Sequence, residues 1–372
     1  MEVRRYEPRY HDELLAFLSR VFAPYPHKSE PPYFEWLFTR NPLGSSLGTY
    51  LLLVDGERVV GQIATLRDRV RIDGGWHECV WIVDLIVDPA FRGGPGVLRL
   101  FREAMRGSEI VFTTGVDASI LRMFEALRWT RRSVTRAKFA VLRPGPLLAL
   151  AGGSRGGVHA GTALRSALAV ADLLLPVAQR LGAGARRLAS RGALHVEDVP
   201  CFGPALEGDI ARLTEQYAVA EFRSAAVLNW KFTQRPVGRQ QLLVLREPTG
   251  AVRGVMVLKW MTRPSVARWI DVADYLAAPN DLAAVRRLTA EAVARAAACD
   301  FDFVRMRLSW PEHVRALRRP LWVDHTRPVT DDVFFTSRDP RLREALTSSP
   351  WHLTALAADR VDTGRDEWPA SA

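Results

Sequence analysis

The chain contains an internal repeat. Residues 33–44 read YFEWLFTRNPLG, and residues 227–238 read VLNWKFTQRPVG. The residues that recur in the same order are Trp36, Phe38, Thr39, Pro42 and Gly44, and then Trp230, Phe232, Thr233, Pro236 and Gly238. Because self-similarity at a long spacing indicates a repeated unit, the sequence predicts two copies of one domain, about 190 residues apart.

The segments around each copy follow the same order. Each copy is followed by two apolar stretches with a charged, glycine-containing turn between them, which predicts a β-hairpin from Leu51 and another from Leu242. Farther on, the run from Trp81 to Asp84 is echoed by Trp269-Ile270-Asp271, and a proline then leads into an amphipathic helix in each half. We therefore predict an α/β (α+β) fold of two tandem domains, each a mixed central sheet flanked by helices.

Composition and motifs count against a nucleic-acid-binding protein, a metalloprotein and a hydrolase. The formal net charge of +10 could suit a polyanion, but only four of the 51 basic residues are lysines, a bias typical of GC-rich coding. We therefore expect the charge to attract small anions and do not expect nucleic acid as a partner. The eight histidines show no paired metal-ligand spacing, so no metal is predicted, and no G-x-S-x-G motif indicates a hydrolase.

Cysteine usage and hydropathy bear on the compartment. Cys79, Cys201 and Cys299 are far apart and form no C-x-x-C pair, as expected in a reducing cytoplasm. No apolar run is long enough for a transmembrane helix, and the N-terminus lacks a signal-peptide pattern. We expect a cytoplasmic protein, as a monomer or a homodimer.

A strand, a glycine-containing loop and a helix follow one another between residues 80 and 105. The nearly continuous apolar run from Val80 to Val87 is typical of a strand buried on both faces. From Pro95 onward, apolar residues recur on one face of a helix, and proline is well tolerated in a first helical turn. Since free N–H groups and the positive helix end meet in such a loop, it predicts a pyrophosphate site.

These residues resemble the GNAT superfamily of acyl-CoA-dependent N-acyltransferases. Family members carry a strand ending in V-x-P, then R-G-x-G-x-G or R-G-x-G-x-A, then a helix, and the run from Val87 to Gly93 follows this pattern. Pro95 and Val97 depart from it, because they replace a glycine and the last small residue. Pro95 also has no N–H, so the loop offers one donor fewer or shifts its register by one residue.

Two further segments extend the resemblance. The stretch from Asp117 to Trp129 is similar to a later helix of the family, with Arg128-Trp129 in place of Gly-Phe. The tandem arrangement with a W-x-[FY]-x-x-x-P-x-G element in each half is similar to GNAT-like proteins encoded with bacterial surface-polysaccharide genes. The resemblance covers residues 1–142 and, more faintly, 200–338.

The resemblance implies transfer of an acetyl or other acyl group from acetyl-CoA or another acyl-CoA to a small-molecule amine, such as an amino sugar or an amino acid derivative. Family strands splay apart after the buried strand and bind the thioester and pantetheine arm there, and the loop binds the phosphates. The corresponding cofactor-binding positions are Leu85, Ile86, Val87, Arg92, Gly93, Gly94, Gly96, Val97 and Phe124. At the last of these positions many members have a tyrosine that protonates the leaving group, whereas Phe124 has no hydroxyl.

Two acids are candidates for the catalytic base. Burial raises the pKa of a carboxyl group, so an acid within an apolar strand suits proton abstraction near neutral pH. Asp84 is the first candidate and Glu78 the second, and strict alternation places both on one face of the strand if no bulge intervenes. The alternative is that Asp84 is a structural carboxylate paired with an arginine or with backbone N–H groups, which its echo at Asp271 favours.

The second half lacks a comparable loop. Asn280 and Asp281 stand where phosphates would lie, so we expect this half to close the acceptor cleft and to bind no second cofactor. The predicted divisions are an N-terminal cofactor-binding domain (1–143), an Ala/Gly/Leu/Arg-rich helical connector (144–194), a degenerate C-terminal domain (195–340) and a partly disordered extension (341–372).

Two other functions stay open at this point. An aminoacyl-tRNA-dependent transferase of the two-domain GNAT-like type would give the basic charge a purpose. A non-catalytic binding or scaffold protein would account for Pro95 in the loop and for Phe124.

Overall fold

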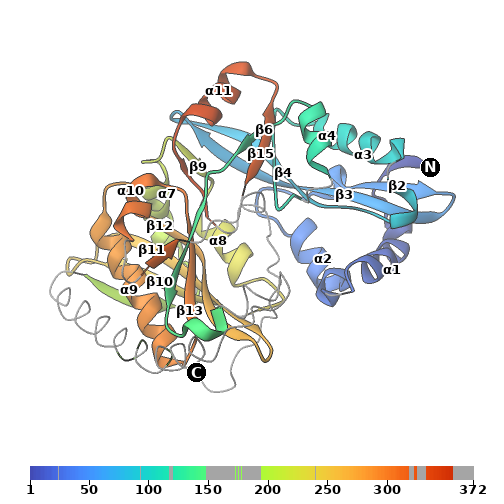
Figure 1. Ribbon diagram of the computed structural model, residues 1–372. Helices are drawn as coiled ribbons and strands as arrows, with labels where there is room; N and C mark the ends of the chain where they lie inside the picture. The colour runs from blue at the N-terminus through green and yellow to red at the C-terminus, as the bar shows by residue number, and fades with distance from the viewer. Residues whose placement is uncertain are drawn as a thin grey trace.

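Two mixed β-sheets, each with helices on both faces, form the framework of the chain (Figure 1). This computed structural model describes residues 1–23, 25–92, 94–116, 120–147, 194–238, 240–317, 322–324 and 332–354, together with residues 172, 175 and 177. Gly93, Asp117, most of the predicted connector and the C-terminal tail from residue 355 lie outside the described residues. The predicted α/β class with two mixed sheets is confirmed.

The first sheet has the strand order β1-β2-β3-β4-β5-β15-β6, with β9 paired to β3 and β16 paired to β9. Its pairs are antiparallel except for β4 with β5 and β9 with β16. Its strands are β1 (Glu2–Arg5), β2 (Leu51–Asp55), β3 (Arg58–Ile72), β4 (Gly75–Val87), β5 (Ile110–Thr114), β6 (Thr130–Arg132), β9 (Val219–Glu221), β15 (Val333–Ser337) and β16 (Trp351–His352).

The second sheet has the order β14-β7-β13-β12-β11-β10-β8, and β12 with β13 is its parallel pair. Both predicted hairpins are present, as β2 with β3 and as β10 with β11. The strands of this sheet are β7 (Arg136–Val141), β8 (His195–Val199), β10 (Gln240–Arg246), β11 (Val252–Arg263), β12 (Ala267–Ala277), β13 (Phe303–Leu308) and β14 (Trp322–Asp324).

Helices cover both faces of each sheet. The α-helices are α1 (His11–Val21), α2 (Pro31–Phe38), α3 (Pro95–Met105), α4 (Leu121–Ala126), α7 (Glu207–Thr214), α8 (Ala225–Phe232), α9 (Leu282–Ala298), α10 (Pro311–Ala316) and α11 (Pro340–Ser348). The 3-10 helices are η1 (Pro8–Tyr10), η2 (Pro26–Ser29), η3 (Leu47–Thr49), η4 (Pro89–Phe91) and η6 (Pro204–Leu206). On the first sheet, α1 and α2 pack on one face and α3 and α4 on the other (Figure 1).

The turn between the two longest strands of the first sheet follows from its sequence. Asp73 and Gly74 join β3 to β4, and both have a positive φ, of 46° and 96°. Two residues with positive φ make a turn whose twist matches that of a β-hairpin, and Asp-Gly is a preferred sequence for it. The turn aligns Ile72 with Gly75 and so sets the register of the β3–β4 pair that carries the candidate site.

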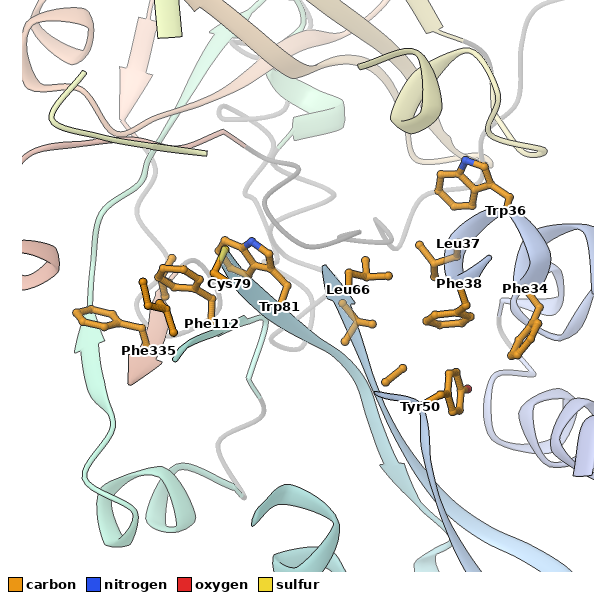
Figure 2. Close-up of a cluster of buried hydrophobic side chains, with 14 of the residues drawn as sticks. Phe34, Trp36, Leu37, Phe38, Tyr50, Leu66, Cys79, Trp81, Phe112 and Phe335 are labelled. Atoms are coloured by element: carbon orange, nitrogen blue, oxygen red, sulfur yellow. The ribbon is translucent and has the colours of Figure 1, made fainter. Parts of the chain in front are cut away.

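Each sheet contains at least one strand from the other half of the sequence. β7, from the first half of the sequence, lies between β13 and β14 in the second sheet, and β15, from the second half, lies between β5 and β6 in the first. Phe335 of β15 packs near Phe112 of β5, with ring centroids 6.2 Å apart, inside the core of the first sheet (Figure 2). Sheet membership therefore departs from sequence order at β7 and β15, and also at β9 and β16, which come from the second half and join the first sheet. The predicted domain boundaries remain predictions.

The two repeated segments contact each other. Trp36 of α2 donates from Nε1 to the carbonyl of Trp230 at 2.7 Å, and Trp230 of α8 donates to the carbonyl of Trp36 at 2.9 Å. Their rings lie 5.5 Å apart, and both are nearly fully buried. This reciprocal pair relates the halves as the two subunits of a symmetric dimer would be related.

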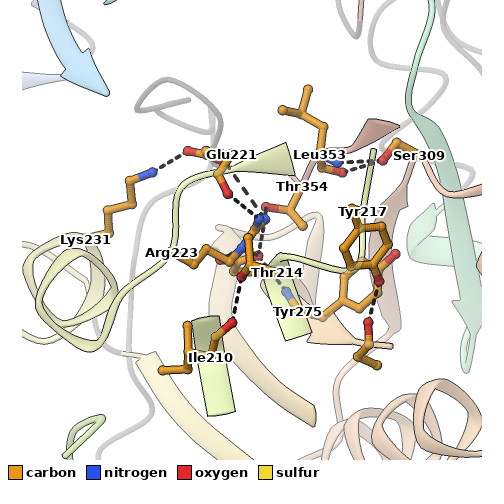
Figure 3. Close-up of polar contacts among 12 residues, drawn as sticks. Ile210, Thr214, Tyr217, Glu221, Arg223, Lys231, Tyr275, Ser309, Leu353 and Thr354 are labelled. Atoms are coloured by element: carbon orange, nitrogen blue, oxygen red, sulfur yellow. Dashed lines mark hydrogen bonds and ion pairs between the residues drawn. The ribbon is translucent and has the colours of Figure 1, made fainter. Parts of the chain in front are cut away.

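A buried polar network also joins the halves. Lys231 of α8 contacts Glu221 of β9 (Figure 3) and lies 4.0 Å from Asp68 of β3. Arg223 pairs with Asp274 at 3.1 Å. The group contains three carboxyls and two cations, so one proton would neutralise it, and an unbalanced buried charge is costly. Burial, opposed in part by Lys231, raises the pKa of Asp68 to about 7.

Candidate active site

Strand β4 carries a β-bulge at the first candidate base. Val83 faces Ala64 of β3 and Ile86 faces Gln62, so Asp84 and Leu85 together oppose one residue of β3. The φ of Asp84 is 51°, in the left-handed region that aspartate tolerates better than most residues. The bulge therefore lies at the position that carries the candidate carboxylate.

The bulge reverses the direction of the Asp84 side chain. Val80 and Ile82 pack in the core beneath α3, whereas Asp84 contacts Lys28 of η2 on the opposite face. Strict alternation would have placed Asp84 on the same face as Val80 and Ile82 only in a strand without a bulge, and that condition is not met, because the extra residue and the positive φ break the alternation.

A lysine lies directly on this carboxylate. Lys28 Nζ is 2.5 Å from Asp84 Oδ1, and the two side chains are 8% and 17% exposed. The ammonium also lies 4.4 Å from the centroid of the Phe22 ring. The sequence predicted apolar surroundings for Asp84, but a cation also contacts its carboxylate and orients it. No sequence pattern identified Lys28 as part of this site, although a lysine among so many arginines is a signal.

Two further side chains brace the bulge. Gln62 donates from Nε2 to the carbonyl of Asp84 at 3.3 Å, and the hydroxyl of Tyr50 donates to Gln62 Oε1. Burial first, and then the charge of Asp84, raises the pKa of Tyr50 well above its ordinary value. Tyr50 thus stays a hydrogen-bond donor and holds the amide of Gln62 toward the bulge.

Strands β4 and β5 part at this point. Their parallel pairing runs from Cys79 with Ile110 to Trp81 with Phe112, although β4 continues to Val87. Leu85, Ile86 and Val87 therefore lie beyond the paired stretch, on an edge that no described strand covers on the β5 side. Backbone N–H groups at such an edge can donate to a carbonyl oxygen, as the resemblance implies for these three residues.

The loop after β4 leads to the first turn of α3. Gly94 is the N-cap and Pro95 the first helical residue, so the N–H groups of Gly94, Gly96 and Val97 have no acceptor within the helix. Arg92 is exposed, and its Nε donates to the carbonyl of Val87 at 2.9 Å, which ties the loop to the end of β4. The helix end can therefore bind an anion next to the parted strands.

Gly96 has a packing role as well. A Cβ at this position would lie 2.9 Å from both Cδ atoms of Leu53 on β2. Its lack of a side chain lets the first turn of α3 approach β2 closely.

The remaining candidate residues lie elsewhere. Glu78 is 75% exposed and pairs with Arg69 at 3.2 Å, six residues before Asp84 on β4, so the structure does not bring the two acids together. Phe124 is 2% exposed and packs among aromatic rings in the core. The rings around it are those of Phe101, Trp129 and Phe334.

The second half has a counterpart of the ion pair. Asp274 lies five residues before Pro279, as Asp84 lies five before Pro89, and it pairs with the fully buried Arg223. The sequence repeat suggested Asp271 as the counterpart of Asp84, but Asp271 pairs with Arg305 of β13, at 2.6 Å. That assignment was wrong. The segment from Trp269 to Asp271 is one residue shorter than the segment from Trp81 to Asp84, so matching the two segments aligned different positions of β12 and β4.

The second half also lacks an anion site at its corresponding helix. Asp281 is the N-cap of α9, and its carboxylate accepts from the N–H of Ala284 at 3.0 Å. Arg253 pairs with the same carboxylate at 2.6 Å. A carboxylate of the chain thus occupies the end of α9, where α3 has Gly94.

No group of three or more histidine, cysteine, aspartate or glutamate side chains in the described part of the chain could hold a metal ion. No helix there is long and apolar enough to cross a membrane.

Comparisons with known proteins agree with this geometry. Residues 2–125 match the acetyltransferase (GNAT) domain family. Among solved structures, the chain is similar to a GCN5-related N-acetyltransferase from Anabaena variabilis, with a TM-score of 0.60 and 11% identity over 91% of this chain and 73% of that one. No curated protein matches the sequence.

Two other solved structures have the same fold. Eis1 from Mycobacterium abscessus has a TM-score of 0.54 and 15% identity, over 91% of this chain and 74% of that one. N-myristoyltransferase from Saccharomyces cerevisiae has a TM-score of 0.52 and 10% identity, over 90% of this chain and 79% of that one. The family match shows that residues 2–125 form a GNAT domain, and the solved structures show that the chain shares the fold of GNAT proteins.

Proposed function

We propose that the protein is an acyl-CoA-dependent N-acyltransferase whose active site is the bulge of β4. The observation that supports this most is the bulge itself: it carries a carboxylate at the point where β4 has left β5, and the loop that follows this strand leads to an uncapped helix start. The second half has the bulge and an ion pair but a capped helix, so the proposal concerns the first half alone.

The residues of the first half fit an acyl-CoA. The N–H groups of Gly94, Gly96 and Val97, with Arg92 nearby, would hold the phosphates. The edge formed by Leu85, Ile86 and Val87 would hold the pantetheine arm and the thioester carbonyl. When bound, the cofactor supplies an acyl group activated as a thioester.

The side chains around the bulge supply the acceptor chemistry. Asp84 would hold the ammonium of the acceptor and take up its proton, since its carboxylate already binds one ammonium, that of Lys28. The N–H groups of the parted edge would stabilise the negative charge that develops on the carbonyl oxygen. Phe124 has no hydroxyl to protonate the thiolate, so we assign that step to solvent.

A thermal-shift experiment tests this proposal. We expect acetyl-CoA or a longer acyl-CoA to stabilise the protein, by about 2.7 kcal/mol at about 100 times Kd. Gly94→Asp should abolish the shift, because it gives α3 the carboxylate cap that Asp281 gives α9. A Cβ at Gly94 would meet its nearest neighbour at 3.6 Å, so the variant should fold.

The matched control is Asp281→Asn, which alters the cap of α9 and should leave the shift unchanged. Turnover of an amine panel by the stabilised protein would then identify the acceptor. Stabilisation without turnover would support the non-catalytic binding protein, and stabilisation by bulk tRNA alone at low salt would contradict the proposal in favour of an aminoacyl-tRNA-dependent transferase.

A further inference from the structure

One amine of the chain already lies where an acceptor amine would bind. Lys28 Nζ is 2.5 Å from the carboxylate of Asp84, and the lysine side chain is only 8% exposed. The ammonium lies against the ring of Phe22, so an aromatic side chain and the carboxylate define its position. An amine held against a candidate base is the arrangement that N-acylation needs.

The other lysines of the chain are placed differently. Lys138 is as buried as Lys28 and pairs with Asp324 at 2.8 Å, but it lies on β7 in the second sheet. Lys231 contacts Glu221 in the network between the halves, and Lys259 lies on β11. Of the four lysines, Lys28 is therefore the one that contacts the β4 bulge.

The bulge connects this amine to the proposed thioester site. Asp84 is followed directly by Leu85, Ile86 and Val87, whose strand edge would hold the thioester. We propose that Lys28 is an autoacylation site, which receives an acyl group from the acyl-CoA bound at this edge. The inference rests on the proposed function, because it requires that an acyl-CoA binds there.

The chemistry of this step balances without a further reactant. The ammonium of Lys28 gives one proton to the carboxylate of Asp84, and the nitrogen attacks the thioester carbonyl carbon. A carbon–nitrogen bond forms, the carbon–sulfur bond breaks, and the second proton of the nitrogen passes through solvent to the departing thiolate. The products are an amide on Lys28 and free coenzyme A thiol, and Asp84 returns its proton to solvent. The amide carries no charge, so the modified side chain no longer pairs with Asp84.

Mass spectrometry tests the inference. The purified full-length protein is incubated with acetyl-CoA, and acetylation is followed by intact mass and by peptide mapping. We expect one acetyl group per chain, at Lys28, added at least about tenfold faster than at Lys138, because an oriented amine beside a base gains at least this much. Lys138 is the internal control, since it has similar burial and a carboxylate partner.

Variants separate site-directed transfer from general lysine reactivity. Lys28→Arg keeps a cation at Asp84 and should remove the label, and Gly94→Asp should slow labelling because it blocks the cofactor site. Acetyl-N-acetylcysteamine, a thioester without the nucleotide, should label Lys28 no faster than Lys138. Equal labelling of the two lysines by acetyl-CoA, or full labelling of the Gly94→Asp variant, would overturn the inference.

The binding measurement distinguishes this inference from the proposed function. A thermal shift with acetyl-CoA but no label at Lys28 would overturn the autoacylation and leave the proposed function standing. The absence of both would count against the proposed function itself.

Discussion

Gly96 couples the first turn of α3 to the core of the first sheet. Gly96→Ala would place a methyl group 2.9 Å from two carbon atoms of Leu53, which is fully buried and cannot move away freely. We expect a net loss of about 1–2 kcal/mol in the free energy of unfolding, because overpacking outweighs the better helix propensity of alanine.

Urea unfolding at constant pH measures this loss. Gly94→Ala is the matched control two residues earlier, where the nearest atom would be 3.6 Å away, and it should change the free energy by less than about 0.5 kcal/mol. An unchanged or raised stability of Gly96→Ala would show that Leu53 yields and that the contact is not close-packed.

Asp68 makes the stability of the protein depend on pH. Its pKa of about 7 in the folded protein exceeds the value of about 3.9 expected in the unfolded chain. The folded protein therefore binds the extra proton between these two values, and its stability falls as the pH rises through this window. Asp68→Asn keeps a hydrogen-bonding amide and removes the titration.

We expect Asp68→Asn to be more stable than the wild type at pH 8, and the difference to shrink by roughly 2–3 kcal/mol at pH 5. The measurement is the difference in unfolding free energy between the two proteins at each pH. Asp55→Asn, at an exposed ion pair with the N-terminus on the same sheet, is the control and should show little pH-dependent difference. A constant difference for Asp68→Asn would rule out its titration in this range.

The residues of the site were predictable only in part. Asp84 could be selected from the sequence because an acid interrupts an apolar strand. The direction of the Asp84 side chain could not be predicted, since the positive φ of this residue decides which face of the sheet the side chain reaches. Lys28 lies 56 residues away in the sequence and is brought to Asp84 by the packing of η2 on the sheet, so no local pattern pairs them.

At the scale of elements, α2 and α8 form the clearest contact between the halves. Trp36→Phe removes the Nε1 donor and leaves the buried carbonyl of Trp230 without its partner. We expect a loss of about 1–3 kcal/mol in unfolding free energy, and a similar loss for Trp230→Phe, because the two bonds are reciprocal.

Denaturant unfolding of the two single variants and the double variant measures the coupling. The loss of unfolding free energy in the double variant should differ from the sum of the two single losses, since the rings contact each other. Trp129→Phe is the control: it removes a buried indole whose Nε1 has no acceptor among the described residues, so little hydrogen-bond energy is lost. Equal losses at Trp36 and Trp129 would show that ring volume alone matters.

The strand, loop and helix of the candidate site were predicted correctly as elements. The apolar run to Val87 is the end of β4, and Pro95 is the first residue of α3. Apolar periodicity and the position of proline are local signals, which explains this agreement. The place where β4 and β5 part depends on the pairing of segments far apart in sequence, and no local signal reports it.

At the scale of the whole molecule, the exchanged strands make each half depend on the other. A fragment of residues 1–143 would lack β15, so β5 and β6 would have no strand between them. It would also expose the unpaired β7. We expect the fragment to lack stable tertiary structure, because unpaired strand edges and uncovered apolar side chains remain.

Circular dichroism and NMR of the fragment test this expectation, and co-expression with residues 194–372 is the positive control. The full chain should unfold in a single cooperative transition. A folded monomeric fragment, or two separate transitions of the full chain, would contradict the interdependence of the halves.

The sequence by itself determined that this chain is duplicated, that its first half carries the strand–loop–helix of a GNAT domain and that its second half does not. These conclusions depend on residue identity and local periodicity, which no later packing alters. Only the tertiary structure decided that the halves exchange β7 and β15, that Trp36 and Trp230 bind each other, and that Asp84 faces Lys28. The physical reason is that these features arise from contacts between segments far apart in the sequence. Strand partners, the face that a side chain at a bulge reaches, and buried ion pairs are selected only when the whole chain is packed.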